Sequence, residues 1–107
     1  IKSEKDRILS DAKLLENVGV FSIVLECVET SLAKLVTKNV SVPTIGIGAS
    51  KYCDGQILVF DDLIGLNPTN FRFVKKFANI RKVISKAVLN YSKDVRENKF
   101  PNKKNSY

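Results

Sequence analysis

One carboxylate in this chain stands where chemistry is commonly found. Glu26 follows the apolar run of residues 20–25, which is too short for a typical helix and indicates a buried strand. In barrels of alternating strands and helices, catalytic groups lie at the C-terminal ends of parallel strands. Glu26 is therefore the candidate catalytic residue. The alternative is a structural carboxylate whose charge is satisfied by backbone groups or by a lysine.

A second strand-like run, residues 42–48, contains two more candidates, Gly46 and Gly48. This G-x-G is not a dinucleotide fingerprint, because the third glycine and the opening helix are missing. Glycine inside a strand indicates close backbone approach or a packed neighbour. Substrate lining and simple packing both remain open for these two residues.

Asp54 begins the Asp-Gly turn signal that follows this run. Its position after the strand predicts that it lies on the same C-terminal side as Glu26, as a third substrate-lining candidate. A turn without chemistry is the alternative.

Other polar residues are weaker candidates. The Asp61-Asp62 pair has the hard oxygens that suit Mg²⁺, but a solvated or capping pair is the simpler interpretation, and we assign no metal ligand. Lys75 and Lys76 are expected to be solvent-exposed. Cys27 and Cys53 are expected to be free thiols, because the chain has no CxxC pair and no histidine.

The elements that must position these residues alternate between helix and strand. An amphipathic helix is predicted over residues 3–18, with an S-x-x-D cap at its start and Gly19 at its end. A strand over residues 20–26, a helix over 29–38 and a strand over 42–48 follow. This order is typical of an α/β fold with a parallel sheet and crossover helices.

The second half of the chain is less regular. A helix ended by Gly65 is predicted within residues 57–66, then a loop over 67–70 and a short third strand over 71–78. The clearest element is a long C-terminal helix over residues 80–95, with Asn79 as its N-cap. Residues 98–107 form a polar tail anchored by Phe100-Pro101.

Charge is unevenly spread over the chain. The net charge is +7, and residues 71–107 alone carry eleven Lys or Arg against two acids, which gives +9. Such asymmetry can indicate nucleic-acid binding, or simply a solvated helix face with a polar tail. No apolar run approaches the roughly 20 residues of a membrane span, and the first residues do not form a signal peptide.

Several segments, in order and spacing, resemble the C-terminal part of the ketopantoate hydroxymethyltransferase family. The resemblance covers residues 10–107, and each segment alone is weak. The matching segments are Leu25-Glu26-Cys27-Val28, Pro43-Thr44-Ile45-Gly46-Ile47-Gly48-Ala49, Cys53-Asp54-Gly55-Gln56-Ile57-Leu58-Val59, Asp62-Leu63-Ile64-Gly65-Leu66, Phe73-Val74-Lys75-Lys76-Phe77-Ala78 and Phe100-Pro101.

The resemblance implies a fold, a reaction and an assembly. The fold is the C-terminal part of a (β/α)8 TIM barrel, with residues 1–107 as a single segment. The reaction transfers a hydroxymethyl group from 5,10-methylenetetrahydrofolate to 3-methyl-2-oxobutanoate, giving 2-dehydropantoate. Glu26 aligns with the family's proton acceptor, and Mg²⁺, bound by residues of the family's N-terminal half, polarises the oxo acid. A cytoplasmic homo-oligomer, a decamer, is expected.

This chain departs from the family pattern at four positions. Glu29 replaces a usual proline, Ser50 a usual glycine, and Asp61 and Asn105 replace usual histidines. Any helper role of those histidines is therefore in doubt.

Two other functions remain open. One is a related Mg²⁺-dependent oxo-acid lyase of the barrel type, which would not need the folate. The other is a small basic nucleic-acid-binding module, although no nucleic-acid motif is present. The chain is short for a barrel of about 250 residues and begins with Ile1, which suits a fragment that is inactive without the preceding half.

Overall fold

The computed structural model describes residues 3–107. Contacts between the described residues group them into two compact units. The N-terminal unit comprises residues 3–59 and 70–74, and the C-terminal unit comprises residues 60–69 and 75–107.

Two helices of the N-terminal unit match the predictions. Helix α1 spans Glu4–Asn17, and the hydroxyl of its N-cap Ser3 accepts a hydrogen bond from the Asp6 N–H at 3.2 Å. Gly19, with φ +92°, turns the chain after α1. Helix α2 spans Thr30–Asn39, one residue from the predicted bounds at each end.

A three-stranded parallel sheet forms the rest of the N-terminal unit. Its strands are β1 (Ile23–Glu26), β2 (Thr44–Ile47) and β3 (Gly55–Gln56), in the order β1-β2-β3. The first two are the predicted strands, shortened to the residues that pair with each other. The α/β class with a parallel sheet is confirmed.

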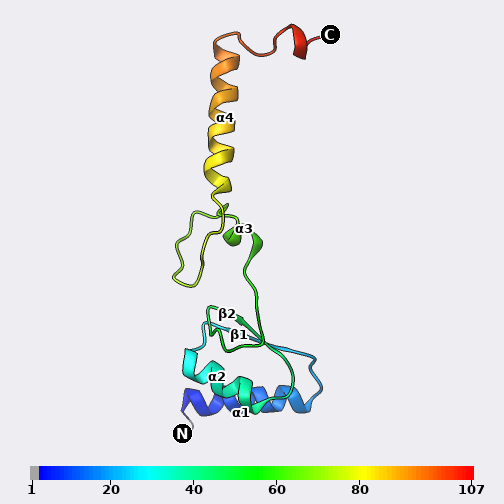
Figure 1. The fold of residues 1–107 in the computed structure, drawn as a ribbon, viewed down its shortest axis with the longest axis vertical. Helices are drawn as coiled ribbons and strands as arrows, with labels where there is room; N and C mark the ends of the chain where they lie inside the picture. The colour runs from blue at the N-terminus through cyan, green and yellow to red at the C-terminus, as the bar shows by residue number, and fades with distance from the viewer. Residues whose placement is uncertain (1–2) are drawn as a thin grey trace. The chain divides into compact units, whose positions relative to one another are not determined.

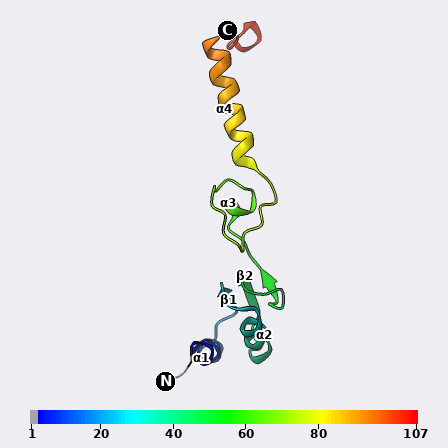
Figure 2. The same cartoon turned by 90° about the vertical axis from the view of Figure 1, so that its left-hand side faces the viewer.

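The core lies on one side of this sheet. Figures 1 and 2 both place α1 and α2 on the same side of β1 and β2. Side chains from the strands and helices pack together there, namely Ala12, Ile23, Leu25, Leu32, Ala33 and Val36. The α2 hydroxyl of Thr37 meets that of Thr44 at 2.8 Å, so Thr44 also faces α2.

The opposite face of the sheet is open in the described residues. Successive residues of a strand point to opposite faces, and β1 alternates between buried and exposed positions. Val24 is 55% exposed, and Glu26 is exposed on the same face. The catalytic candidate is thus exposed at the carboxyl end of β1.

The third strand does not lie where the sequence predicted it. Residues 71–78 form no strand; Phe71 and Phe73 instead stack, with ring centroids 5.6 Å apart. The strand is Gly55–Gln56, within the predicted turn region. It exists because β2 supplies its pairing partners: the N–H of Ile57, just after β3, donates to the carbonyl of Gly46 at 3.0 Å.

The C-terminal unit begins with a helix shorter than predicted. Helix α3 covers only Phe60–Leu63. Gly65, with φ +72°, turns the chain after it as predicted, and a Cβ there would collide with the carbonyl oxygen of Ala78. The Asp62 side chain is buried, and it accepts a hydrogen bond from the Asn67 side chain at 2.7 Å. Of the predicted alternatives, a solvated or a capping pair, the solvated one is wrong for Asp62, whose side chain braces this turn.

Helix α4 spans Ile80–Arg96, and its N-cap Asn79 accepts a hydrogen bond from the Lys82 N–H. None of its residues is buried. The tail contains one 3-10 turn, η1, Lys103–Asn105. Phe100 anchors the tail as predicted, because its ring packs edge-on against the Tyr91 ring of α4, with ring centroids 5.7 Å apart. No helix within residues 3–107 is long and apolar enough to cross a membrane.

Candidate functional site

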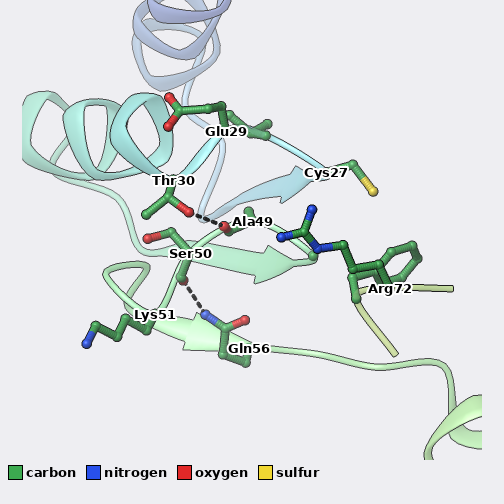
Figure 3. Close-up of a pocket in the computed structure, with 11 residues that line it drawn as sticks. Cys27, Glu29, Thr30, Ala49, Ser50, Lys51, Gln56 and Arg72 are labelled. Carbon is green, nitrogen blue, oxygen red and sulfur yellow. Dashed lines mark hydrogen bonds between the residues drawn. The ribbon is translucent and has the colours of Figure 1, made fainter. Parts of the chain in front are cut away.

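An open pocket of about 800 Å³ lies in the N-terminal unit, where β1 and β2 end (Figure 3). Three segments surround it: the turn from β1 into α2, the loop after β2, and the short segment around Phe73. Its lining combines apolar and polar side chains, namely Cys27, Val28, Glu29, Thr30, Gly48, Ala49, Ser50, Lys51, Gln56, Arg72 and Phe73.

Hydrogen bonds from two neighbouring elements hold the loop after β2. The Thr30 hydroxyl, at the start of α2, donates to the Ala49 carbonyl at 3.3 Å. From β3, the Gln56 side-chain amide donates to the Ser50 carbonyl at 2.6 Å (Figure 3). The Ser50 hydroxyl is buried and accepts a hydrogen bond from the Tyr52 N–H at 3.1 Å. The pocket floor is thus tied to the sheet and to α2.

Gly48 lets a distant segment reach this pocket. Its φ is +63°, and a Cβ built on it would lie 2.8 Å from both Cβ and Cγ of Phe73. Real Cβ atoms essentially never come so close, so any larger residue would displace Phe73. The close approach that a strand glycine predicts is therefore real, and its partner is an aromatic side chain.

The segment that carries Phe73 also carries Arg72 into the pocket lining. In Figure 3 the Arg72 guanidinium points toward Ala49 and the ends of β1 and β2. The stacked rings of Phe71 and Phe73 and a hydrogen bond from the Val74 N–H to the Phe71 carbonyl at 3.0 Å shape this segment. The guanidinium is thereby presented by a locally braced turn.

Glu29 is the one acidic side chain of the pocket lining, and its carboxylate accepts hydrogen bonds from the start of α2. As the N-cap of α2, its carboxylate accepts hydrogen bonds from the Ser31 hydroxyl at 2.5 Å, the Ser31 N–H at 3.0 Å and the Leu32 N–H at 3.2 Å. The hydrogen bonds from Ser31 hold the pKa of Glu29 below its ordinary value. Glu29, which departs from the family pattern, thus caps the N-terminus of α2.

Glu26 lies beside this pocket. It lines a smaller pocket of about 420 Å³ between α1 and the β1–α2 turn, and Cys27, Val28 and Glu29 border both pockets. Within residues 3–107 its carboxylate has no hydrogen bond or ion pair. Cys27, the next residue, has φ +52°. Glu26 is thus an exposed carboxylate at the carboxyl end of a parallel strand, as the sequence predicted.

Gly46 faces the covered side of the sheet. It pairs with Leu25 and with Gln56, and a Cβ there would lie 3.0 Å from the Gln56 amide atoms and 3.2 Å from the Cys53 sulfur. Gly46 lines neither of the two pockets described above. Its geometry supports the packing alternative.

Both cysteine thiols are free, with Cys27 exposed and Cys53 buried.

The predicted position of Asp54 is wrong. Its carboxylate accepts hydrogen bonds from the N–H of Thr44 at 2.8 Å and from the Thr44 hydroxyl at 3.3 Å. Thr44 is the first residue of β2, and Asp54 itself precedes β3. Asp54 therefore lies at the amino end of the sheet, opposite Glu26. The chain folds back after β2 before β3 begins, which the sequence order alone does not show.

The structure adds pocket residues that the sequence did not single out, above all Arg72, Phe73 and Thr30. A glycine at the end of a strand indicates that something approaches closely, but not what. Only the fold shows that residue 73 fills the space beside residue 48.

The described residues do not provide a metal site. Within residues 3–107, no three side chains of the metal-ligating types Asp, Glu, Cys or His come together. Asp61 and Asp62, the carboxylates that could have suited Mg²⁺, lie in α3. The Asp61 backbone carbonyl accepts hydrogen bonds from the N–H groups of Leu66 and Asn67.

Comparison with known proteins identifies the family whose sequences this chain matches. The family described as ketopantoate hydroxymethyltransferase matches residues 1–103. A 3-methyl-2-oxobutanoate hydroxymethyltransferase from Pelagibacter ubique is 65% identical over 105 residues, which cover 98% of this chain and 41% of that protein. Proteins of the same name from Kosmotoga olearia and Clostridium botulinum are 52% and 48% identical over 103 and 109 residues, covering 38% and 40% of their lengths.

The match extends over almost the whole of this chain but over only about 40% of each relative. It includes the strand that ends in Glu26 and all segments that line the pocket. The chain therefore belongs to the ketopantoate hydroxymethyltransferase family.

Proposed function

We propose that this chain is part of an enzyme that transfers a hydroxymethyl group to 3-methyl-2-oxobutanoate, with 5,10-methylenetetrahydrofolate as the donor, giving 2-dehydropantoate. The family and the names of its relatives support transfer of a hydroxymethyl group to this oxo acid, and the folate donor is what the family resemblance implies. The single observation that carries it is the exposed, unpartnered carboxylate of Glu26 at the carboxyl end of β1, beside the pocket.

Glu26 would act as the general base. Its carboxylate takes the proton from C3 of the oxo acid, and the electron pair left on C3 forms the new carbon–carbon bond to the methylene carbon of the donor. Both bonds from that carbon to the N5 and N10 nitrogens of the donor break, and water supplies the hydroxyl oxygen. The two nitrogens take up the proton held by Glu26 and one proton of the water, and tetrahydrofolate leaves. Such a base must reach the proton directly, and Glu26 is not tied to any group of the described residues.

The magnesium that the family resemblance implies does not fit the described residues, since these bring no three ligating side chains together. We propose that its ligands belong to the part of the relatives that this chain does not match, and we derive no step through the metal. We also propose that the rest of a barrel covers this chain and that the complete enzyme is a homo-oligomer. The exposed face of the sheet and the match to only 41% of the relative support a covering barrel.

A hybrid enzyme would test this function. In it, residues 1–107 replace the matching 41% of the Pelagibacter ubique relative. We expect the hybrid to form 2-dehydropantoate and to exchange the C3 proton of 3-methyl-2-oxobutanoate with solvent deuterium. Glu26→Gln should abolish that exchange, because an amide cannot accept the proton.

Glu97→Gln is the matched control, since Glu97 only pairs with Lys99 after α4. Exchange at the normal rate in Glu26→Gln would remove Glu26 from its role. Turnover of the 2-oxo acid that does not depend on methylenetetrahydrofolate would favour the oxo-acid lyase instead. An inactive but folded hybrid would contradict the proposed reaction.

A further inference from the structure

We propose that Arg72 binds a carboxylate of one of the two reactants and so makes the pocket after β2 an anion-binding part of the active site. This inference rests on the proposed function, because it takes its ligand from that reaction. It adds a specificity-determining residue that acts beside Glu26.

The first argument is the state of the guanidinium. Arg72 lines the pocket, and within residues 3–107 its side chain has no ion pair and no hydrogen bond to a side chain or carbonyl. A guanidinium offers five N–H donors in a planar fork that matches a carboxylate. The Arg72 donors point toward the ends of β1 and β2 in Figure 3.

The second argument is that the charge is not neutralised nearby. Glu29 is the only acid of the lining, and its carboxylate accepts three hydrogen bonds at the start of α2 and forms no ion pair with Arg72. In Figure 3 that carboxylate lies over α2, away from Arg72. Lys51 adds a second positive charge to the lining, with its ammonium 5.5 Å from the Tyr52 ring centre. Two positive charges against the one negative charge of Glu29 give the lining a net positive charge, which favours an anion.

The third argument is how the fold positions Arg72. Phe73 sits in the space that the missing side chain of Gly48 leaves at the end of β2. Because its neighbour Phe73 packs against Gly48, Arg72 lies beside the end of β2. Gly48 and Phe73 are thus positioning residues for the anion contact.

Both reactants carry carboxylates. The 2-oxo acid has one next to its reacting ketone, and the folate donor has those of its glutamate. The apolar lining by Val28, Ala49 and Phe73 would suit hydrocarbon or aromatic parts of either ligand. Either ligand would place a carboxylate against the Arg72 guanidinium, and kinetics can tell whether it comes from the oxo acid or from the folate donor.

The test is steady-state kinetics of the hybrid enzyme with Arg72→Gln and Arg72→Lys. Losing a charge-assisted hydrogen-bonded pair should raise KM for one reactant about 10- to 100-fold with a smaller change in kcat. Lysine should restore only part of the loss, because it presents a point charge without the fork. Arg81→Gln, an exposed substitution in α4, is the control for a general change in charge.

The pattern of KM values identifies the ligand. A raised KM for 3-methyl-2-oxobutanoate assigns its carboxylate to Arg72. A raised KM for methylenetetrahydrofolate, absent when the donor lacks its glutamate, assigns the donor. Values within twofold of the Arg81→Gln control for both reactants overturn the inference while the parent hybrid's activity still supports the proposed function.

Binding provides a readout that does not need turnover. Calorimetric titration of the folded hybrid with 3-methyl-2-oxobutanoate, and separately with tetrahydrofolate, should show weaker binding of one ligand in Arg72→Gln. Equal dissociation constants for both ligands in the parent and the variant would contradict the role of Arg72, even if the hybrid proved inactive.

Discussion

At the scale of single residues, two glycines with positive φ serve different purposes. Gly19 has φ +92° and no atom within 4 Å of a Cβ built on it, so it only permits a turn after α1. Gly48 combines φ +63° with the contact of Phe73 at 2.8 Å. The first requirement is for backbone freedom alone, whereas the second also concerns the geometry of the pocket.

This difference predicts unequal effects of alanine at the two positions. Each substitution forces a side chain into the left-handed region, at a cost of roughly 1–2 kcal/mol. Gly48→Ala must also displace Phe73, so urea unfolding of the hybrid should show a larger loss of stability than for Gly19→Ala. Gly48→Ala should raise the same KM as Arg72→Gln, and Gly19→Ala should not. Equal losses in both variants would show that the Phe73 contact carries no weight.

At the scale of elements, carboxylates tie helix ends to their surroundings in the N-terminal unit. Glu29 caps the start of α2, and Glu16, near the end of α1, accepts hydrogen bonds from the N–H groups of Ser41 and Val42 ahead of β2. The hydrogen bond from the Ser41 N–H is the main cause that lowers the pKa of Glu16. These contacts order the turns between helices and strands, which carry the pocket residues.

The cap at Glu29 predicts a pH-dependent contribution to stability. Because the folded-state pKa of Glu29 lies below its ordinary value of 4.5, the folded state binds the proton less readily than the unfolded state. The stabilisation is therefore present above about pH 4.5 and is lost as the pH falls through the lowered folded-state pKa.

Urea midpoints of the hybrid and its Glu29→Gln variant should accordingly differ at pH 7 and converge as the pH falls below 4.5. Glu97→Gln provides the comparison, since an exposed ion pair such as Glu97–Lys99 contributes little. A difference at Glu29 that is the same at pH 7 and pH 4 would mean that the carboxylate charge does not stabilise α2.

At the scale of the whole molecule, the described residues leave much apolar surface uncovered. Helix α4 has no buried residue, although Ile84, Val88, Tyr91 and Val95 repeat with the spacing of one helical face. The sheet face that carries Val24 and Glu26 is also open. Contiguous exposed apolar patches mark surfaces that bind other protein or cause aggregation, in agreement with a chain that spans about 40% of its relatives.

We therefore expect residues 1–107 by themselves to self-associate and to be inactive. Sedimentation velocity should show species larger than the 12.0 kDa monomer, and Val88→Lys should reduce their fraction because it places a charge within the apolar stripe. Lys86→Gln, an exposed change elsewhere on α4, should not. A purely monomeric chain would show that these faces do not need to be covered.

The sequence alone determined the local elements and the family. Hydrophobic spacing and capping residues predicted α1, α2 and α4, since these depend on neighbours within a few positions along the chain. The order of short motifs indicated the family, and Glu26 was placed at the end of its strand by a simple run of apolar residues. These features arise from short-range patterns that survive without any tertiary contact.

Only the tertiary structure decided which distant residues meet. The pairing of Gly46 with Gln56 makes a strand where the sequence predicted a turn, and the fold-back before it puts Asp54 at the opposite end of the sheet from Glu26. The space beside Gly48 is filled by Phe73, which brings Arg72 to the pocket. Each of these depends on partners ten or more residues away, whose packing and hydrogen bonds outweigh the weak local preferences of short segments.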